Sequence, residues 1–223
     1  MRTCTECALP WWGRAAAVAL FGSVAIAPVV AAQTILEQFS AESLAPRAIG
    51  VDLGALGGTR IDGATVVALR VDVGPVAPRV RVLLGLSYFQ ANLTNGELAT
   101  FAARLRSLVV DPTGDATIEL GQVSWGDLSG DLDLQYVLPT RGTVALYAGL
   151  GASVHVRHGS GPAIDGTFVQ DALDGINPGI NGTLGAEFGT GQWRVVLEGR
   201  GVLASGLSTA GVVCGLRYHW ARR

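Results

Sequence analysis

The end of the chain, "GVVCGLRYHWARR" at residues 211–223, carries the clearest indication of the fold. Its residues change character with a period of two, which is the period of a β-strand. One face is apolar and ends in aromatic rings, whereas the other carries glycine, arginine and histidine. The first face consists of Val212, Cys214, Leu216, Tyr218 and Trp220, and the second of Gly211, Val213, Gly215, Arg217 and His219. Such a strand is typical of a wall between lipid and a polar interior.

The same period of two recurs in seven earlier segments. In each of them aliphatic residues take one face, and mainly small, polar or charged residues take the other. The segments are residues 48–56, 66–73, 80–89, 127–137, 144–156, 180–188 and 193–200. Together with the C-terminal strand they predict an all-β fold, an eight-stranded antiparallel transmembrane β-barrel over residues 46–220.

The connections between these segments alternate in length. Tight connections fall at residues 74–78, 139–142 and 189–192, and long ones at about residues 91–117 and 158–178. Tight turns on one side and longer loops on the other are the layout of a bacterial outer-membrane barrel, so we expect periplasmic turns and extracellular loops. In the first long loop, Leu98, Phe101, Leu105 and Leu108 repeat at helical spacing, which predicts a short extracellular helix.

The polar faces indicate which side meets water. A soluble barrel would carry long, solvated lysine and glutamate side chains outside, but the sequence contains no lysine. Small residues and charges of both signs suit the crowded interior of a narrow barrel. Because buried charges must be paired, we expect an interior network of arginines and carboxylates. Its predicted members are Asp52, Arg70, Asp72, Arg81, Asp131, Asp133, Glu187, Arg194, Glu198, Arg200 and Arg217.

In architecture, residues 46–220 resemble the small outer-membrane β-barrels of the OmpA/opacity type. A glycine followed by aromatics three and five residues later, here Gly215, Tyr218 and Trp220, is similar to the signal that their assembly machinery reads. Val213 stands where a polar residue is usual, and "ARR" follows where such chains often end. The resemblance implies location in the cell outer membrane, contact with the lipid bilayer and lipopolysaccharide, and the barrel-assembly machinery as a partner. It leaves the activity open.

The N-terminal residues predict export. Residues 1–32 have the form of a signal peptide, in which an apolar run ends on small residues, and cleavage is expected after Ala32. A membrane anchor is the alternative, but the run of 18 residues is near the lower limit for a span and Pro28 interrupts it. Residues 33–45 are predicted to form a short amphipathic helix. Cys214 would be the only cysteine after cleavage and should face lipid, where it is inert.

Few residues suggest catalysis or metal binding. Ser153 and His155 lie two apart on the predicted inward face, but a nucleophile and base need a third, orienting group, and the sequence shows no complete triad. Asp127, Asp131 and Asp133 share a face, where pairing with interior arginine is favoured over calcium binding. We expect no metal, no cofactor and no enzymatic activity. The net charge of −2, without a basic stripe, argues against a nucleic-acid partner.

The function predicted from these observations is a structural or surface-interaction role. Residues 91–117 and 158–178 are the loops through which an extracellular ligand would bind. One alternative is a narrow channel for ions or small solutes, with a conductance that changes in Arg70 or Asp131 variants. A second is a lipid A-modifying outer-membrane enzyme whose activity His155→Ala abolishes. A soluble secreted barrel is a third, which recovery in the periplasm would support.

Overall fold

The computed structural model describes residues 44–108, 121–138, 140, 142–162, 164–167, 170 and 173–220. The predicted signal peptide and residues 33–43 of the predicted N-terminal helix lie outside these residues. Leu44 and Ala45, the last two residues of that predicted helix, are described and are not helical. No helix in the described ranges is long and apolar enough to cross a membrane.

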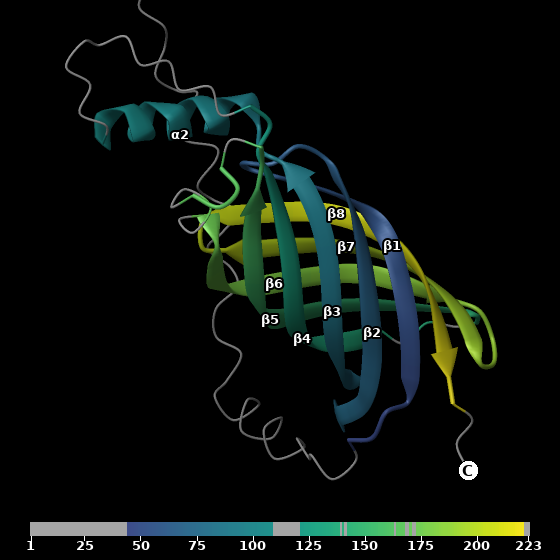
Figure 1. Ribbon diagram of the computed structural model, residues 1–223. Coiled ribbons are helices and arrows are strands. Elements are labelled where there is room, and N and C mark those ends of the chain that lie inside the picture. The colour runs from purple at the N-terminus through teal and green to yellow at the C-terminus, as the bar shows by residue number, and fades with distance from the viewer. Residues whose placement is uncertain are drawn as a thin grey trace, which may run out of the picture. The chain divides into compact units, whose positions relative to one another are not determined.

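Eight antiparallel strands close into a barrel (Figure 1). Each strand pairs with the next in the sequence, and the last pairs back with the first. The strands are β1 (Ala48–Gly58), β2 (Ala64–Ala77), β3 (Val80–Asn92), β4 (Ser124–Leu138), β5 (Val144–Ser160), β6 (Gly175–Phe188), β7 (Trp193–Ala204) and β8 (Leu207–His219). Closure gives the paired strands partners on both edges, as a sheet in lipid requires. The predicted fold class is confirmed.

A helix, α2 (Asn95–Leu108), forms in the first long loop, as the helical spacing predicts. The hydroxyl oxygen of Thr94 accepts a hydrogen bond of 3.4 Å from the backbone N–H of Glu97, which caps the first turn. Ala102 is buried and Phe101 is partly buried against apolar residues near the loop end of the barrel. The helix is therefore packed onto the barrel by its apolar face.

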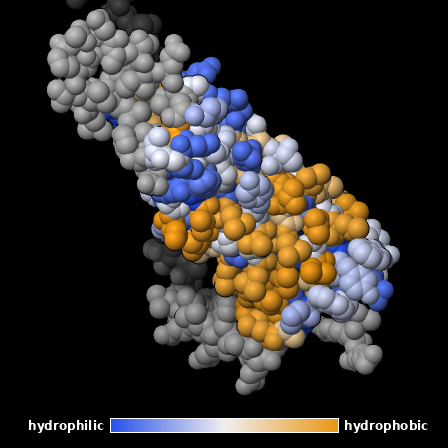
Figure 2. All heavy atoms as spheres, in the orientation of Figure 1, coloured by the Kyte–Doolittle hydropathy of each residue, from blue (hydrophilic) through white to orange (hydrophobic). Residues whose placement is uncertain are grey.

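The alternation of the sequence becomes the two faces of the barrel wall. Val51 and Leu53 are more than half exposed on the outside, while Asp52 between them is fully buried inside. Figure 2 shows a broad apolar band on the visible face, with hydrophilic residues gathered toward α2. An apolar exterior around a charged interior is the inverse of a water-soluble protein, and only lipid covers such a band favourably.

Inward glycines make room for charged side chains. A Cβ atom on Gly215 would overlap the carboxylate of Asp52, and one on Gly85 would overlap Arg70 and Asp131. Small residues line the interior because long side chains from neighbouring strands lie directly over them. This is how a barrel of eight strands fills its own lumen.

The second strand ends later than the sequence predicts. Residues 74–77 of the predicted turn belong to β2 instead, which continues to Ala77 through two register shifts against β3. Such bulges insert an extra residue and increase the local twist, which a simple alternation pattern does not show. The turn is confined to Pro78 and Arg79. Arg79 has a φ of 67°, the left-handed conformation that a type II turn places after its proline.

The two long loops also have different bounds. β4 begins only at Ser124, so the first loop comprises residues 93–123 instead of 91–117. β5 extends to Ser160 and β6 begins at Gly175, so the second comprises residues 161–174 instead of 158–178. The second loop is shorter because strand pairing extends to Arg157↔Gly175.

Aromatic side chains gather at the turn end of the barrel. The ring centroids of Trp193 and Tyr218 are 4.9 Å apart, and those of Tyr218 and Trp220 are 6.3 Å apart. Trp193 and Trp220 are exposed on the outside. Amphipathic rings at this level are typical of a membrane interface.

Candidate functional site

An ionic cluster fills the middle of the interior. The Arg200 cluster comprises Asp52, Arg70, Asp131, Asp133, Glu198 and Arg200. The guanidinium of Arg200 lies 2.6 Å from Asp131 and 3.3 Å from Glu198, and it also contacts Asp133. Arg70 shares Asp131 with Arg200, so two arginines from β2 and β7 meet on one carboxylate of β4.

A second ionic cluster lies toward the turn end. The Glu187 cluster comprises Asp72, Arg81, Glu187, Arg194 and Arg217. The fully buried carboxylate of Glu187 lies 2.6 Å from Arg81, 2.5 Å from Arg217 and 3.4 Å from Arg194. His219 is 3.9 Å away from the same carboxylate. Each cluster crosses the barrel between strands that are distant in sequence.

Two neutral residues join the clusters. The amide oxygen of Gln135 accepts hydrogen bonds of 3.1 and 2.9 Å from Arg81, and its amide nitrogen donates to Glu198 at 3.4 Å. The hydroxyl of Tyr147 donates to Glu198 at 2.9 Å. Its ring lies 5.0 Å from the guanidinium carbon of Arg81 and 5.9 Å from that of Arg217, within cation–π range. The two clusters therefore form one connected interior.

A serine, a histidine and an aspartate form a hydrogen-bonded chain inside the barrel, in the half nearer the long loops. Oγ of Ser153 lies 2.9 Å from Nε2 of His155, and Nδ1 of His155 lies 2.9 Å from Oδ1 of Asp127. Arg157 donates to the other oxygen of Asp127 at 3.0 Å and to the carbonyl of Ser205 at 2.8 Å. The expectation that Ser153 and His155 lack a third, orienting group is therefore wrong, because Asp127 supplies it.

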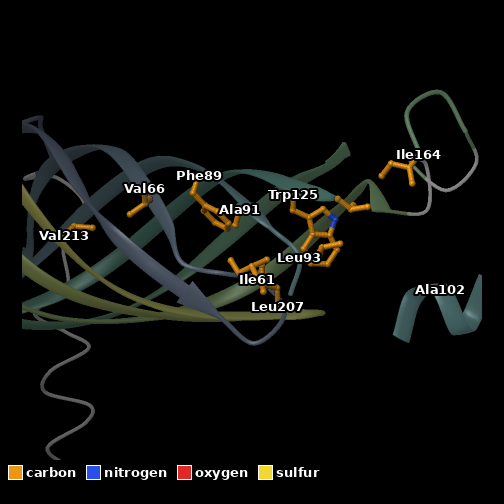
Figure 3. Packing of buried hydrophobic residues seen from close by; sticks show 11 residues of the cluster. Ile61, Val66, Phe89, Ala91, Leu93, Ala102, Trp125, Ile164, Leu207 and Val213 are labelled. Atoms are coloured by element: carbon orange, nitrogen blue, oxygen red, sulfur yellow. The ribbon is translucent and has the colours of Figure 1, made fainter. Parts of the chain in front are cut away.

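Apolar side chains pack the loop end of the interior (Figure 3). The apolar mouth cluster comprises Ile61, Val66, Phe89, Ala91, Leu93, Ala102, Val123, Trp125, Ile164, Leu207 and Val213. Ile61 and Leu93 form an isolated bridge that ties the connection between β1 and β2 to the start of the loop at residues 93–123. The ring of Trp125 lies 5.9 Å from the guanidinium carbon of Arg157, the residue that donates to Asp127.

A small polar latch holds the loop between β5 and β6. Nδ1 of His158 lies 2.9 Å from Oδ2 of Asp174, and the backbone N–H of Gly159 donates to Oδ1 at 2.9 Å. Gln170 donates to the carbonyl of Gly159 at 3.1 Å. The Gly159 N–H holds the pKa of the Asp174 carboxyl below its ordinary value, and His158 adds to that effect.

The structure places all of the predicted network residues inside the barrel, six in the Arg200 cluster and five in the Glu187 cluster. Sequence reasoning omitted Gln135, Tyr147 and Asn181, the last of which donates to Asp133 at 3.0 Å. The alternation already placed these three residues on the inward face. They were not assigned to the network because a neutral side chain does not need a partner of opposite charge. Asp127 was expected to pair with arginine and also holds His155.

A groove runs along the lipid-facing side of β5, β6, β7 and β8 and the end of β1. It has a volume of about 1000 Å³. Exposed Leu150, Ile180 and Leu203 border it, and Gly182 and Gly201 leave its floor without side chains. Cys214 is also exposed on the outer face, as the alternation predicts.

The closed strand order, the apolar exterior and the charged interior together define the class of the protein. The chain is an eight-stranded antiparallel barrel of the transmembrane type. No family model matches the sequence, and no curated protein is similar to it in sequence. No metal-binding group of His, Cys, Asp or Glu is found in the part of the chain that the structure describes.

Similar barrels occur among solved structures. Neisserial surface protein A is 11% identical, with a TM-score of 0.48 over 78% of this chain and 96% of that one. Ail, the attachment invasion locus protein of Yersinia pestis, is 13% identical, with a TM-score of 0.44 over 78% and 97%. The N-terminal β-barrel domain of Pseudomonas aeruginosa OprF is 13% identical, with a TM-score of 0.43 over 77% and 98%. Similarity this distant assigns no ligand or activity to the chain.

Proposed function

We propose that this protein is a closed outer-membrane barrel that acts through its outer surface and extracellular loops and does not conduct through its interior. The filled lumen carries the proposal. The Arg200 and Glu187 clusters occupy the middle and the turn end, and the apolar mouth cluster occupies the loop end. The interior of an eight-stranded barrel is just wide enough for side chains to fill it. A structural or surface-interaction role follows.

Conductance in a planar lipid bilayer tests this proposal against the alternative of a narrow channel. We expect wild-type protein to show no steady current. The double variant Asp133→Ala/Arg200→Ala removes an ion pair from the lumen and serves as a positive control that should leak small ions. A steady wild-type current that Asp131→Asn or Arg70→Gln alters would favour the channel.

The extracellular surface is proposed to consist of two loops, residues 93–123, which include α2, and residues 161–174. An extracellular ligand would bind there. Thr100 on α2 is exposed, as is Thr140 in the turn between β4 and β5. In a Cys214→Ser background, a membrane-impermeant maleimide should label Thr100→Cys in intact cells. It should label Thr140→Cys only after the outer membrane is opened. The reverse pattern would contradict the orientation.

Export and assembly are proposed on the sequence pattern. Residues 1–32 would direct the chain through the inner membrane, and N-terminal sequencing of the mature protein should begin at Gln33. Gly215 also has a packing role beneath Asp52, so Trp220 is the better residue with which to test the assembly signal. Trp220→Ala should lower the yield of folded barrel in cells while refolding into detergent micelles is unchanged. Equal losses in both would contradict a role in assembly.

A further inference from the structure

The chain formed by Ser153, His155 and Asp127 has the order and spacing of a nucleophile, a base and an orienting acid. Both hydrogen bonds are 2.9 Å long, and they use opposite nitrogens of the imidazole. In serine hydrolases the imidazole takes the hydroxyl proton while the carboxylate fixes the ring and its tautomer. Arg157 holds the remaining oxygen of Asp127, so the carboxylate itself is locked in place.

An interior serine of this barrel does not need a histidine for its hydrogen bond. Ser87 and Ser129, on the inward faces of β3 and β4, bond to each other at 3.0 Å. Ser153 instead bonds to an imidazole that is already oriented by a carboxylate. This difference indicates that Ser153 has a role beyond packing the interior.

The strand residue that pairs with Ser153 is a glycine, Gly179. A Cβ atom on Gly179 would lie 2.7 Å from Oγ of Ser153 and 3.2 Å from Nε2 of His155, so only a glycine leaves room for both atoms there. Gly179 pairs with Ala204 as the last pair between β6 and β7. Beyond that pair, residues 175–178 of β6 continue toward the loop end without a partner in β7. The line along which β6 and β7 pair, here called the seam, thus ends at the level of Ser153.

The lipid-facing groove begins at this seam. Ile180 and Leu203, which follow and precede the Gly179–Ala204 pair in the sequence, are two of its borders. Its volume of about 1000 Å³ lies at the upper end of the range for ligand pockets. Bare backbone at Gly182 and Gly201 gives it a depth that the aliphatic side chains elsewhere on the wall do not allow.

We propose that Ser153, His155 and Asp127 form a hydrolase site for acyl esters of lipids in the surrounding leaflet. The acyl chain lies in the groove, and its ester group reaches Ser153 through the end of the seam between β6 and β7. Ser153 and His155 are the catalytic residues, and Asp127 is a positioning residue. This activity goes beyond the surface role proposed above.

The reaction balances with water as the only co-reactant. Oγ of Ser153 bonds to the ester carbonyl carbon while Nε2 of His155 takes the hydroxyl proton. The bond to the alkoxy oxygen then breaks, and the imidazolium gives its proton to the departing alcohol. Water attacks the resulting acyl-serine with His155 again as base, which releases the carboxylic acid and restores the serine.

The test uses the full mature chain in detergent micelles, with p-nitrophenyl decanoate and a decyl fluorophosphonate as probes. We expect the fluorophosphonate to form an adduct on Ser153 that mass spectrometry locates. Ser153→Ala and His155→Gln should lower decanoate hydrolysis about 100-fold or more. Asp127→Asn should lower kcat without changing KM, and Ser87→Ala should change neither. A heat-dependent mobility shift in SDS gels verifies that each variant is folded.

The groove has its own matched pair of variants. A Cβ atom on Gly182 or on Gly130 meets nothing within 4 Å, and both glycines face outward, but only Gly182 lies in the groove. Gly182→Leu should therefore slow the hydrolysis of p-nitrophenyl decanoate several-fold and leave that of p-nitrophenyl acetate unchanged. Gly130→Leu should affect neither. Equal slowing by both variants would overturn the proposed path of the acyl chain.

The lipid source is resolved by fatty-acid release from phosphatidylethanolamine vesicles and from vesicles that contain lipopolysaccharide. Release that Ser153→Ala abolishes identifies which lipid class supplies the ester. A wild-type protein that forms no adduct, and that cleaves esters and lipids no faster than Ser153→Ala, would overturn the proposal.

Discussion

The two ionic clusters of the interior are opposites in charge arrangement. In one, Arg200 is shared among three carboxylates. In the other, Glu187 is shared among three arginines. Each cluster depends on one central ion of the minority sign, and removal of that ion leaves several like charges in a low-dielectric space. The clusters differ in how they respond, because carboxylates can take up protons whereas arginines cannot lose them.

Removal of the Glu187 carboxylate should cause the largest loss in the unfolding free energy of the barrel. Glu187→Gln leaves Arg81, Arg194 and Arg217 around a neutral group, and breaking a buried pair costs about 3–5 kcal/mol. Urea unfolding of the barrel in lipid vesicles measures this loss. Because arginine stays charged, the variant itself should gain no stability as the pH is lowered. A recovery of stability in acid would contradict this description of the cluster.

Removal of the Arg200 guanidinium should lower the unfolding free energy strongly at neutral pH and less strongly in acid. Arg200→Met leaves Asp131, Asp133 and Glu198 without their shared cation. A carboxyl group that has bound a proton no longer repels its neighbours, so acid relieves the repulsion that this variant creates. The difference in unfolding free energy from wild type should therefore narrow between pH 7 and pH 4. A constant difference would mean that the two clusters do not respond differently.

Crowding of the Arg200 cluster should cost less than the loss of its ion. Gly215→Ala drives a methyl group into Asp52, and overpacking of this kind costs about 1–3 kcal/mol. Gly130→Ala, on the outward face with nothing within 4 Å, is the matched control. The temperature at which each variant loses its fast-migrating form in SDS measures the effect. Equal shifts would mean that the interior is looser than these contacts imply.

The link between the clusters should make a smaller contribution. Tyr147→Phe removes the hydroxyl that donates to Glu198 but keeps the ring beside Arg81 and Arg217. The expected loss is about 1 kcal/mol, the net worth of one hydrogen bond, because Gln135 still donates to the same oxygen of Glu198. In a double-mutant cycle with Arg200→Met, the loss should be non-additive. Strict additivity would show that Tyr147 does not couple to the Arg200 cluster.

The loop latch should show the smallest effect, confined to the outside of the barrel. The pKa of Asp174 is lowered in the folded protein, so its contribution is present above its unfolded pKa and is lost as the pH falls through the folded value. Protease cleavage within residues 161–174 should accordingly become faster only in acid. Asp174→Asn should make that cleavage fast at pH 7 as well, without changing the stability of the barrel.

The sequence was sufficient for the faces of the strands but not for the contacts between them. Period-two patterns assign each residue to a side, and the exposed Leu86 and the buried Arg70 lie as assigned. The bulges in β2 add residues without breaking that pattern, so the predicted turn at 74–78 was wrong. Similarly, the turn-forming residues Gly175, Asn177 and Pro178 resembled a loop although they extend β6.

The serine–histidine–aspartate chain shows why register matters. Asp127 stands opposite Arg157 in the β4–β5 pairing, and His155 stands opposite Ser129. The bond between Asp127 and His155 is therefore diagonal, and a different register would separate them. Ser153 and His155 could be placed on one face from spacing alone, because they lie two apart on one strand. Their third partner comes from a strand 28 residues earlier, which no local pattern indicates.

The unequal lengths of the strands also bear on how another cell or molecule meets this protein. β4 has 15 residues and β5 has 17, whereas β1 has 11 and β7 has 12. A strand needs about 9–11 residues to cross a bilayer. The longer strands remain paired with each other out to Ser124 and Ser160 at the loop end. If the loops face outward, as proposed above, an approaching molecule would meet an uneven rim in which this side is formed by the longest strands.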